Sequence, residues 1–383
     1  MRILSIDFSI PYLLKDESYP IGGWAVELSI WLRALEDAGH EAAVLTWKGA
    51  LGHVGSGQQI KLIETYDPAR GVRVAKYFYS YIPKTLAAAR AYRPDVIIQG
   101  ARGVGTGIMA FVANQLRVPF VYRVVSDADV DERYKIGLRH YEWLSYSWAR
   151  YRAAGFLCQN QYQRDQLTAL FPGKSIHVVH NPIDIADIVT APLPRLARSY
   201  VAWLGVFRYA KNLPLLLRIA QELPAIKFRV AGMLSRNADQ STVDAVNGLR
   251  LLPNVELVGY VRRTDIQPFL AEAEMLLCTS RYEGFSNVFL EALAVGTPVV
   301  TRRPVDPDLI VLRHALGASA EDELELCKSV RTIGEMGANE YNGLARRCQL
   351  YVKANHSPTA KAHELIAALT PLVAESKRPR KAR

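Results

Sequence analysis

Apolar and polar stretches alternate along the first half of the chain in a way that predicts strands followed by helices. Arg2–Phe8 is an apolar run of strand length, and from about Trp24 to Ala38 apolar side chains recur at helical spacing on one face. The other elements expected here are strands at Glu41–Trp47, Asp95–Gln99, Pro119–Val125, Gly155–Gln159 and Ile176–His180, and helices at Thr106–Leu116 and Gln161–Phe171. This alternation is typical of a parallel, doubly wound sheet.

The same alternation begins again after residue 198. The expected strands are Tyr200–Leu204, Ile226–Ala231, Val255–Tyr260, Met275–Ser280 and Pro298–Thr301, and the expected helices are Leu213–Glu222, Thr242–Leu251, Asp265–Glu272 and one that contains Glu291. From about Glu321 to Glu375 the pattern predicts helices only. Two open α/β domains of this kind bind ligands between the carboxyl ends of facing strands.

The boundary between the halves is expected in Asn181–Arg198, which contains three prolines and no clear periodicity. We therefore predict a first Rossmann-like domain over residues 1–185, a linker over 186–198 and a second Rossmann-like domain over 199–355. A helix over 356–376 is expected to pack back on the first domain, and residues 377–383 form a basic tail.

Composition narrows the class of protein. The chain has 383 residues, half of them apolar and 22% charged, which is a normal globular mixture for two domains. No apolar run is long enough to span a membrane, and the opening MRILSIDFSI is expected to be a strand and not a signal peptide. The four cysteines lack CxxC spacing, so we expect reduced thiols in a cytoplasmic protein.

The net charge of +10 has two interpretations. Five of the positive charges belong to the tail residues Lys377, Arg378, Arg380, Lys381 and Arg383. Such a tail is solvated and disordered, or it is attracted to an anionic membrane surface on the cytoplasmic side. Because the excess charge is concentrated in a short tail, nucleic acid is not an expected partner.

The segment Thr279–Val300 contains several candidate functional residues close together in the sequence. It is expected to contain a strand end, a glycine turn, a helix with Ser286 as its N-cap, a glycine and the next strand. Glu283 precedes Gly284 in the turn, and Glu291 lies in the second helical turn among apolar residues. A carboxylate there needs a hydrogen-bonding partner or a position facing a cleft. Glu291 is therefore either a partnered structural residue or a ligand-binding one.

Two further segments are suited to anions. Gly22 and Gly23 stand where the first strand leads into the first long helix, so backbone N–H groups can approach a ligand closely. There is no GxGxxG fingerprint at that position, so a nicotinamide site is not supported. In the second half, Gly205 ends a strand, and Arg208 and Lys211 follow in the loop, where two cations suit a phosphate or diphosphate.

With these segments in view, the chain resembles the GT-B fold glycosyltransferases of family 4, which are retaining and use nucleotide sugars. The resemblance covers nearly the whole chain. It rests on the opening strand–GG–helix, on HNPID at His180–Asp184, on the G…R..KN loop, on AGM at Ala231–Met233, on GYV at Gly259–Val261 and on EGFSNVFLEALAVGTPVV, which contains the E-x7-E pattern.

The resemblance implies a role for each matching residue. Glu291 is expected to accept the ribose hydroxyls of the donor, and Glu283 to face the donor sugar. The backbone of Gly284, Phe285 and Ser286 would lie near the sugar and phosphate. Lys211 is expected to bind the diphosphate, and Gly22 and Gly23 to close on it. Two cations, a helix N-terminus and a glycine loop stabilise the leaving nucleoside diphosphate without a metal, so no cofactor is expected.

Two departures from the family pattern are visible. The family usually has Arg directly after the glycine that ends the first strand of the second domain. Here that residue is Val206, and Arg208 is the candidate substitute. Many members also have a His in the first domain after the strand that matches Pro119–Val125. Here the segment is VVSDADVDE, so Ser126 or Asp127 would contact the sugar instead, and Asp127 joins the candidate catalytic residues.

No metal site is expected. Asp127, Asp129 and Asp131 imitate the start of a calcium loop, but positions six and twelve are Glu132 and Leu138. The Asp127-Ala128-Asp129 sequence also resembles the DxD of the other glycosyltransferase fold, which we interpret as coincidence. His177 and His180 lie three apart in an expected strand, which points their rings to opposite faces.

Two stretches of the first half interleave aromatic and basic residues, namely Lys76–Arg93 and Tyr134–Arg152. This pattern suits a membrane interface, a carbohydrate surface or single-stranded nucleic acid, and it is equally typical of core aromatics with solvated charges. Because of the family resemblance, we interpret these two stretches as an acceptor site or as a surface close to lipid.

Together these features predict a retaining hexosyltransferase. It would move a sugar from a UDP- or GDP-sugar to a hydroxyl of a saccharide or lipid-linked acceptor, in the synthesis of cell-surface polysaccharide or glycoconjugate. The alternative is a degenerate GT-B protein that binds a sugar nucleotide or a partner enzyme without catalysis. Val206 and the missing His are the reasons for keeping that alternative.

Overall fold

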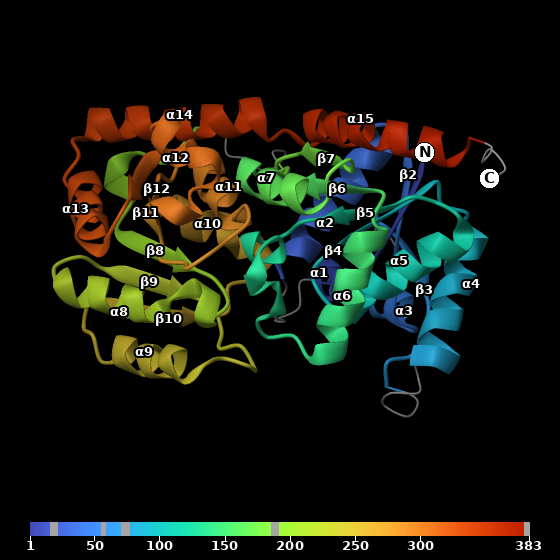
Figure 1. Cartoon of the computed structure of the whole chain (residues 1–383). Helices are drawn as coiled ribbons and strands as arrows, with labels where there is room; N and C mark the ends of the chain where they lie inside the picture. Colours follow the sequence, from blue (N-terminus) through green and yellow to red (C-terminus); the bar gives the residue numbers. More distant parts are fainter. Residues whose placement is uncertain (16–21, 55–58, 70–76, 185–190, 379–383) are drawn as a thin grey trace. The chain divides into compact units, whose positions relative to one another are not determined.

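The computed structural model describes residues 1–15, 22–54, 59–69, 77–184 and 191–378, and the chain divides into two compact units (Figure 1). Unit 1 comprises Met1–Pro182 and Pro358–Arg383, and unit 2 comprises Ile183–Ser357. Residues 185–190, which include the first part of the expected linker, lie outside the described residues, as does the end of the basic tail. Residues 191–198 belong to unit 2.

Unit 1 contains a seven-stranded parallel sheet with the strand order β3-β2-β1-β4-β5-β6-β7. The strands are β1 (Arg2–Ile6), β2 (Glu41–Thr46), β3 (Lys61–Glu64), β4 (Val96–Gly100), β5 (Phe120–Arg123), β6 (Gly155–Cys158) and β7 (Ser175–Val178). The order runs outward from β1 in both directions, so the topological switch point lies between β1 and β4. In open α/β sheets, ligands bind at the carboxyl ends of the strands beside this point.

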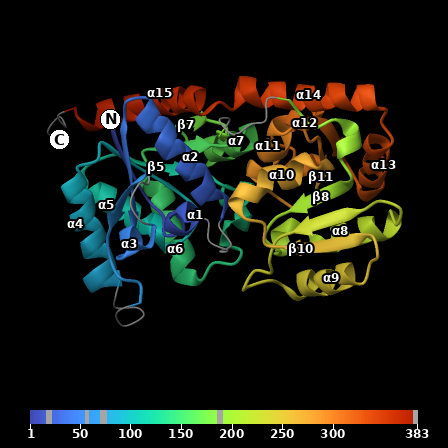
Figure 2. The ribbon, with the colours of Figure 1, turned by 180° about the vertical axis from the view of Figure 1, so that it is seen from behind.

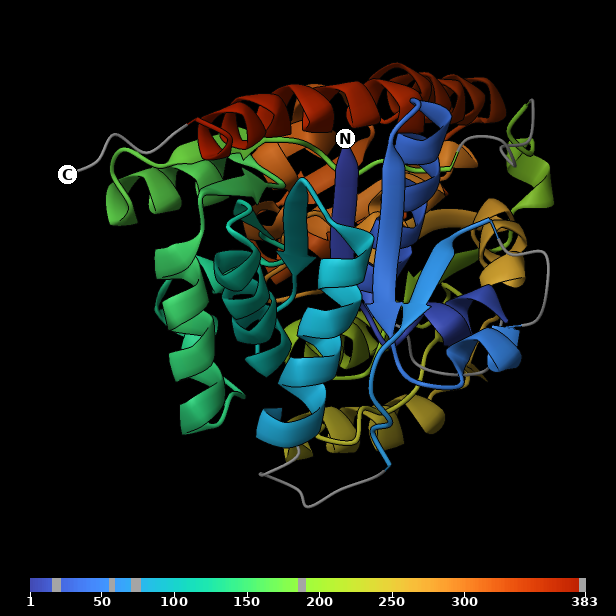
Figure 3. The ribbon, with the colours of Figure 1, turned by 90° about the vertical axis from the view of Figure 1, so that its right-hand side faces the viewer.

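Helices cover both faces of this sheet. On one face, α2 (Gly23–Asp37) packs with the last helix, α15 (Pro358–Ser376), and both contribute to a single apolar core (Figure 2). On the other face lie α4 (Ile82–Tyr92), α5 (Val104–Leu116) and α6 (His140–Arg152), as Figure 3 shows. The remaining described helices of unit 1 are α1 (Ile10–Leu14), α3 (Ala50–Val54), the π-helical turn η1 (Tyr77–Tyr81), the short 3-10 turns η2 (Asp127–Asp129) and η3 (Glu132–Lys135), and α7 (Gln161–Leu170).

Unit 2 repeats this architecture with six parallel strands in the order β10-β9-β8-β11-β12-β13. The strands are β8 (Tyr200–Leu204), β9 (Phe228–Ala231), β10 (Val255–Gly259), β11 (Ala273–Cys278), β12 (Val299–Arg302) and β13 (Gly317–Ala320). One face is covered by α10 (Ile266–Ala271), α11 (Asn287–Ala294), α12 (Ile310–Arg313) and α14 (Ala338–Asn355), and the other mainly by α8 (Leu213–Glu222), α9 (Gln240–Arg250) and α13 (Glu323–Gly334). Its switch point lies between β8 and β11.

The expected α/β class and the parallel sheets are confirmed. The sequence pattern missed β3, an edge strand of four residues, and β13, whose sequence GASA lacks the β-branched and aromatic side chains that mark strands. All four cysteines are buried and unpaired. Among the helices that the structure describes, none combines the length and the apolar character needed to cross a bilayer.

Candidate active site

Glycines shape the carboxyl end of β8 in unit 2. A Cβ atom on Gly205 would lie 3.2 Å from Cε of Lys211, so the missing side chain leaves room for the lysine. At Gly232, which follows β9 with φ +147°, a Cβ atom would come within 1.9 Å of the Gly205 carbonyl oxygen. Only glycine permits this close approach of the two strand ends.

The loop after β8 is held against the end of β11 by hydrogen bonds. The Thr279 hydroxyl donates to the Lys211 carbonyl at 2.9 Å and accepts from the indole N–H of Trp203 at 3.0 Å. The Arg281 backbone N–H donates to the Ala210 carbonyl at 2.7 Å. Lys211 therefore has a fixed backbone beside the segment that contains Glu283.

Lys211 and Glu283 form a partly buried ion pair. The lysine Nζ lies 2.7 Å from Oε1 of Glu283, and the Ser280 hydroxyl donates to the same oxygen at 2.6 Å. Burial acts to raise the pKa of Glu283, but the charge and hydrogen bond of Lys211, the Ser280 hydroxyl and the charge of Arg208 hold that pKa below its usual range. Glu283 is therefore an anion at neutral pH. Arg208 itself is exposed at the start of the short turn that contains Lys211.

Glu291 also has a cationic partner. It lies on α11 with only 4% of its surface exposed, and its carboxylate pairs with the guanidinium of Arg263, from the loop after β10. The ion pair with Arg263 offsets the free-energy cost of burying the Glu291 carboxylate on an apolar helix. Arg263 was not predicted from the sequence, because the pair joins helix α11 to a loop that is distant in sequence.

The turn before α11 is buried. Gly284, Phe285 and Ser286 are all shielded from solvent, and the Phe285 ring packs 5.3 Å from the ring of His356. Ser286 occupies the N-cap position, as expected, but within the described residues its side chain makes no capping hydrogen bond. The expected N-cap position is confirmed.

A further cation, Arg302, lies at the carboxyl end of β12. Its Nη1 donates to the carbonyl of Ser280 at 3.3 Å, and the hydroxyl of the same serine donates to Glu283. Sequence reasoning missed this residue. The available signal was its position directly after the buried strand residues Val299–Thr301, at the strand end where ligands bind.

In unit 1, Gly22 and Gly23 lie at the start of α2. Gly22 is the N-cap in an extended conformation, with φ −72°, which any residue can adopt, and no described atom lies within 4 Å of the position its Cβ would take. The packing of unit 1 therefore does not require a glycine at this position. The expected closing of Gly22 and Gly23 on the donor diphosphate stays a prediction.

A buried polar network fixes the first turns of α2. Nε of Arg123, at the end of β5, lies 2.7 Å from Oε1 of Glu27 on α2, and its Nη2 lies 2.8 Å from Oδ1 of Asn181. The Gln159 amide donates to the other Glu27 oxygen at 3.0 Å. The network ties the helix to the ends of three strands, and the sequence did not predict it.

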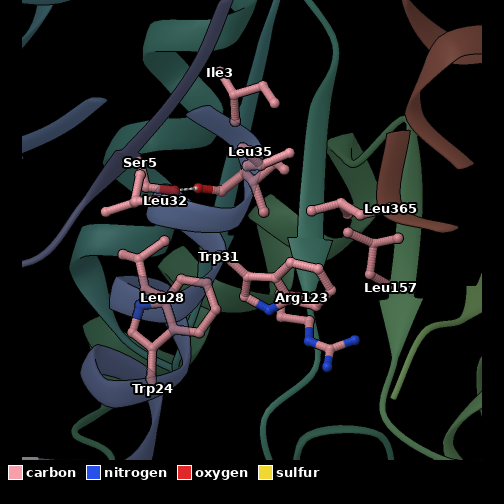
Figure 4. Close-up of a pocket in the computed structure, with 11 residues that line it drawn as sticks. Ile3, Ser5, Trp24, Leu28, Trp31, Leu32, Leu35, Arg123, Leu157 and Leu365 are labelled. Carbon is pink, nitrogen blue, oxygen red and sulfur yellow. Dashed lines mark hydrogen bonds between the residues drawn. The ribbon is translucent and has the colours of Figure 1, made fainter. Parts of the chain in front are cut away.

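An apolar cavity lies in the core of unit 1 under α2 (Figure 4). Its walls include Trp24, Leu28 and Leu157, and Leu365 of α15 also lines it. The Trp24 ring occupies the space of a Cβ at Gly100, 2.6 Å away, and among the described residues its buried indole N–H has no partner. None of the predicted site residues lines this cavity.

Asp127 is engaged within unit 1. Its Oδ1 accepts hydrogen bonds from the side-chain amides of Asn160 and Gln163, each at 2.9 Å, at the start of α7. Asp129 pairs with Arg102, and Asp131 pairs with Arg133. The three carboxylates thus have separate partners, and the described part of the chain contains no cluster of three or more metal-ligating side chains.

Comparisons with known proteins identify the family. The family model "Glycosyltransferase Family 4" matches residues 21–187, and the model "Glycosyl transferases group 1" matches residues 198–334. The chain belongs to the family 4 glycosyltransferases. The two matches fall on unit 1 and unit 2 almost separately, which agrees with one Rossmann-like domain in each.

Relatives place this glycosyltransferase in the GT-B fold. It is 26% identical to glycogen synthase of Mycobacterium tuberculosis (strain ATCC 25618 / H37Rv) over 269 residues, which cover 65% of this chain and 62% of that enzyme. Sucrose-phosphate synthase of Thermosynechococcus elongatus matches with a TM-score of 0.73 at 17% identity, over 98% of this chain and 100% of the other. Anabaena Alr3699/HepE in complex with UDP-glucose matches with a TM-score of 0.74 at 16% identity, over 97% and 100%. The predicted family and fold are confirmed.

Within this glycosyltransferase, the candidate residues divide between the units. Gly22, Gly23 and Asp127 belong to unit 1. The remaining candidates all belong to unit 2, and they are Gly205, Arg208, Lys211, Glu283, Gly284, Phe285, Ser286 and Glu291. The geometry of unit 2 joins Lys211 to Glu283 directly and adds Arg263 and Arg302, so unit 2 holds most of the candidate site.

Proposed function

We propose that the protein is a retaining hexosyltransferase. It would transfer a sugar from a UDP- or GDP-sugar to a hydroxyl of a saccharide or lipid-linked acceptor, in the synthesis of cell-surface polysaccharide or glycoconjugate. The observation that carries the proposal is the Lys211–Glu283 ion pair, held by Ser280 at the switch point of unit 2. The Anabaena relative crystallised with UDP-glucose makes UDP-sugars the first donors to test.

The residues suit the departure of a nucleoside diphosphate. Lys211, with exposed Arg208 and nearby Arg302, offers positive charge where negative charge develops on the leaving group. Glu283 keeps the lysine ammonium in place until the donor arrives. In the proposed front-face mechanism, the departing phosphate takes the proton of the acceptor hydroxyl. No metal cofactor is proposed, because these side chains supply the charge that a cation would otherwise provide.

Substitution of Glu291 tests the proposal. Glu291→Ala removes the carboxylate proposed to bind the ribose, and we expect transfer from a UDP- or GDP-sugar to fall about 100-fold, with loss of the donor's thermal shift. Glu335→Ala, at an exposed glutamate of unit 2, is the matched control and should behave as the unaltered protein. Because Glu291→Ala leaves Arg263 without its partner, the double variant with Arg263→Met separates donor binding from stability.

Undiminished transfer by Glu291→Ala would reject the assignment. The assay is run with and without EDTA, and loss of transfer in EDTA would reject the proposed metal independence.

A donor-binding protein without catalysis is the second candidate. It is favoured by Val206 and by the hydrogen bonds of Asp127 to Asn160 and Gln163. Nucleotide binding by calorimetry without hydrolysis or transfer, across a donor panel, would select it.

A further inference from the structure

The outer face of α6 in unit 1 carries an exposed apolar stripe. The stripe is defined by Tyr141, Leu144, Trp148 and Tyr151, which are 49%, 49%, 40% and 71% exposed. Their spacings of three, four and three residues place them on one side of the helix. The opposite side, with Tyr146 and Ala149, is buried. Large apolar side chains gathered on one exposed face mark an interaction surface.

The helix that presents this stripe is firmly held. A Cβ atom on Gly107 of α5 would lie 1.9 Å from Oγ of Ser145, so α5 and α6 pack at very short range. At the other end, the Lys174 ammonium donates to the carbonyls of Arg150 at 3.1 Å and Ala153 at 2.7 Å, which caps the helix. The exposure of the stripe is therefore a property of a rigid element.

The surroundings of the stripe are basic. Figure 3 shows α4, α5 and α6 side by side on one face of the sheet. The sequence of these three helices contains one acidic residue, Glu142. The exposed cations on the helices and their nearest flanking residues are Lys84, Arg90, Arg93, Arg117, Arg139 and Arg152. Lys135, further from α6, is also exposed but pairs with the exposed Glu132. This layer therefore complements a negatively charged partner.

We propose that the α4–α6 layer docks on the surface of a bilayer that contains anionic lipids, with the α6 stripe entering the headgroup region. Trp and Tyr prefer the interface between headgroups and acyl chains, and each nearby Lys or Arg adds attraction to an anionic membrane. The layer combines both features, whereas an acidic peptide would need only the charges. The proposal does not depend on the sugar-transfer function, and it assigns membrane contact to this layer instead of to the basic tail.

Vesicle co-sedimentation of the full chain tests the proposal. The protein should bind vesicles of phosphatidylcholine mixed with phosphatidylglycerol, bind phosphatidylcholine alone much less, and lose binding as salt is raised. The triple variant Leu144→Gln/Trp148→Gln/Tyr151→Gln should bind at least about tenfold more weakly. The matched control Leu251→Gln/Leu324→Gln/Leu350→Gln alters leucines of unit 2 that are 83%, 77% and 57% exposed, and it should bind normally.

Two further measurements complete the test. A blue shift of Trp fluorescence on vesicles should be reduced by Trp148→Phe, and removal of residues 377–383 should leave binding intact. Equal binding by the triple variant, or failure of the unaltered protein to bind the mixed vesicles, would overturn the proposal. Binding of a single-stranded oligonucleotide in place of vesicles would make nucleic acid the partner and would also overturn it. Donor binding in solution should be the same for all variants, so failure of this surface is distinguishable from failure of the proposed function.

Discussion

At the scale of single residues, Arg302 is our candidate for the charge that the family's arginine supplies at the position of Val206. Arg302 donates to the carbonyl of Ser280, and the hydroxyl of that serine donates to Glu283. Arg302→Met is expected to lower kcat/KM for the nucleotide sugar about tenfold, because a charge-assisted contact with the diphosphate is lost. Steady-state kinetics measure this, with Arg346→Met, at an exposed arginine of α14, as the control. Unchanged kinetics would remove Arg302 from the donor site.

A second residue, Asp7, makes stability depend on pH. Its Oδ1 accepts the backbone N–H groups of Ser9 at 2.7 Å and Ile10 at 3.1 Å, yet burial raises its pKa from 3.8 to about 6. Because the folded pKa lies above the unfolded one, ionisation costs stability, with no cost below about pH 4 and the full cost above about pH 6.

Asp7→Asn keeps the accepting oxygen and removes the charge. We expect it to raise the free energy of unfolding by about 1–3 kcal/mol at neutral pH, and we expect this gain to vanish below about pH 4. Urea unfolding across that pH range measures it. A gain independent of pH would show that Asp7 does not titrate in this way.

At the scale of elements, the start of α2 depends on a buried charge network. Arg123 is 2% exposed and pairs with Glu27, which is equally buried. Arg123→Met should lower the free energy of unfolding by about 3–5 kcal/mol, because it leaves the Glu27 carboxylate buried without its ion pair. The double variant Glu27→Gln/Arg123→Met should recover part of this loss in urea unfolding. A smaller loss for the single variant than for the double would contradict the account.

The elements also show what the sequence could predict. Long periodic segments such as α2 and α8 were found because their buried faces repeat at helical spacing. Glu283 and Lys211 were identified because the motifs that contain them resemble those of a known family. The pair of Glu291 with Arg263 could not be found, because nothing local in the sequence indicates which distant loop will supply the partner. The same holds for Arg123, whose partners come from α2, from the end of β6 and from the segment that follows β7.

At the scale of the whole molecule, unit 1 is built from both ends of the described chain. Leu369 of α15 is fully buried in the core that α2 also forms. Leu369→Ala should lower the stability of unit 1 by about 2–5 kcal/mol. Native-state hydrogen exchange should show faster exchange in α2, while α8 in unit 2 keeps its protection. Equal acceleration in both units would show that they unfold as one cooperative body.

The late position of α15 in the sequence also affects how unit 1 folds during translation. The strands of unit 1 are synthesised first, but the apolar face of α2, with Leu28 and Leu35, lacks its cover until Pro358–Ser376 has emerged. At 5–20 residues per second, translation of unit 2 in between takes roughly 10–35 s. Unit 2 can therefore complete its core first. During that time the nascent unit 1 exposes the apolar face of α2, which is the kind of surface that chaperones bind.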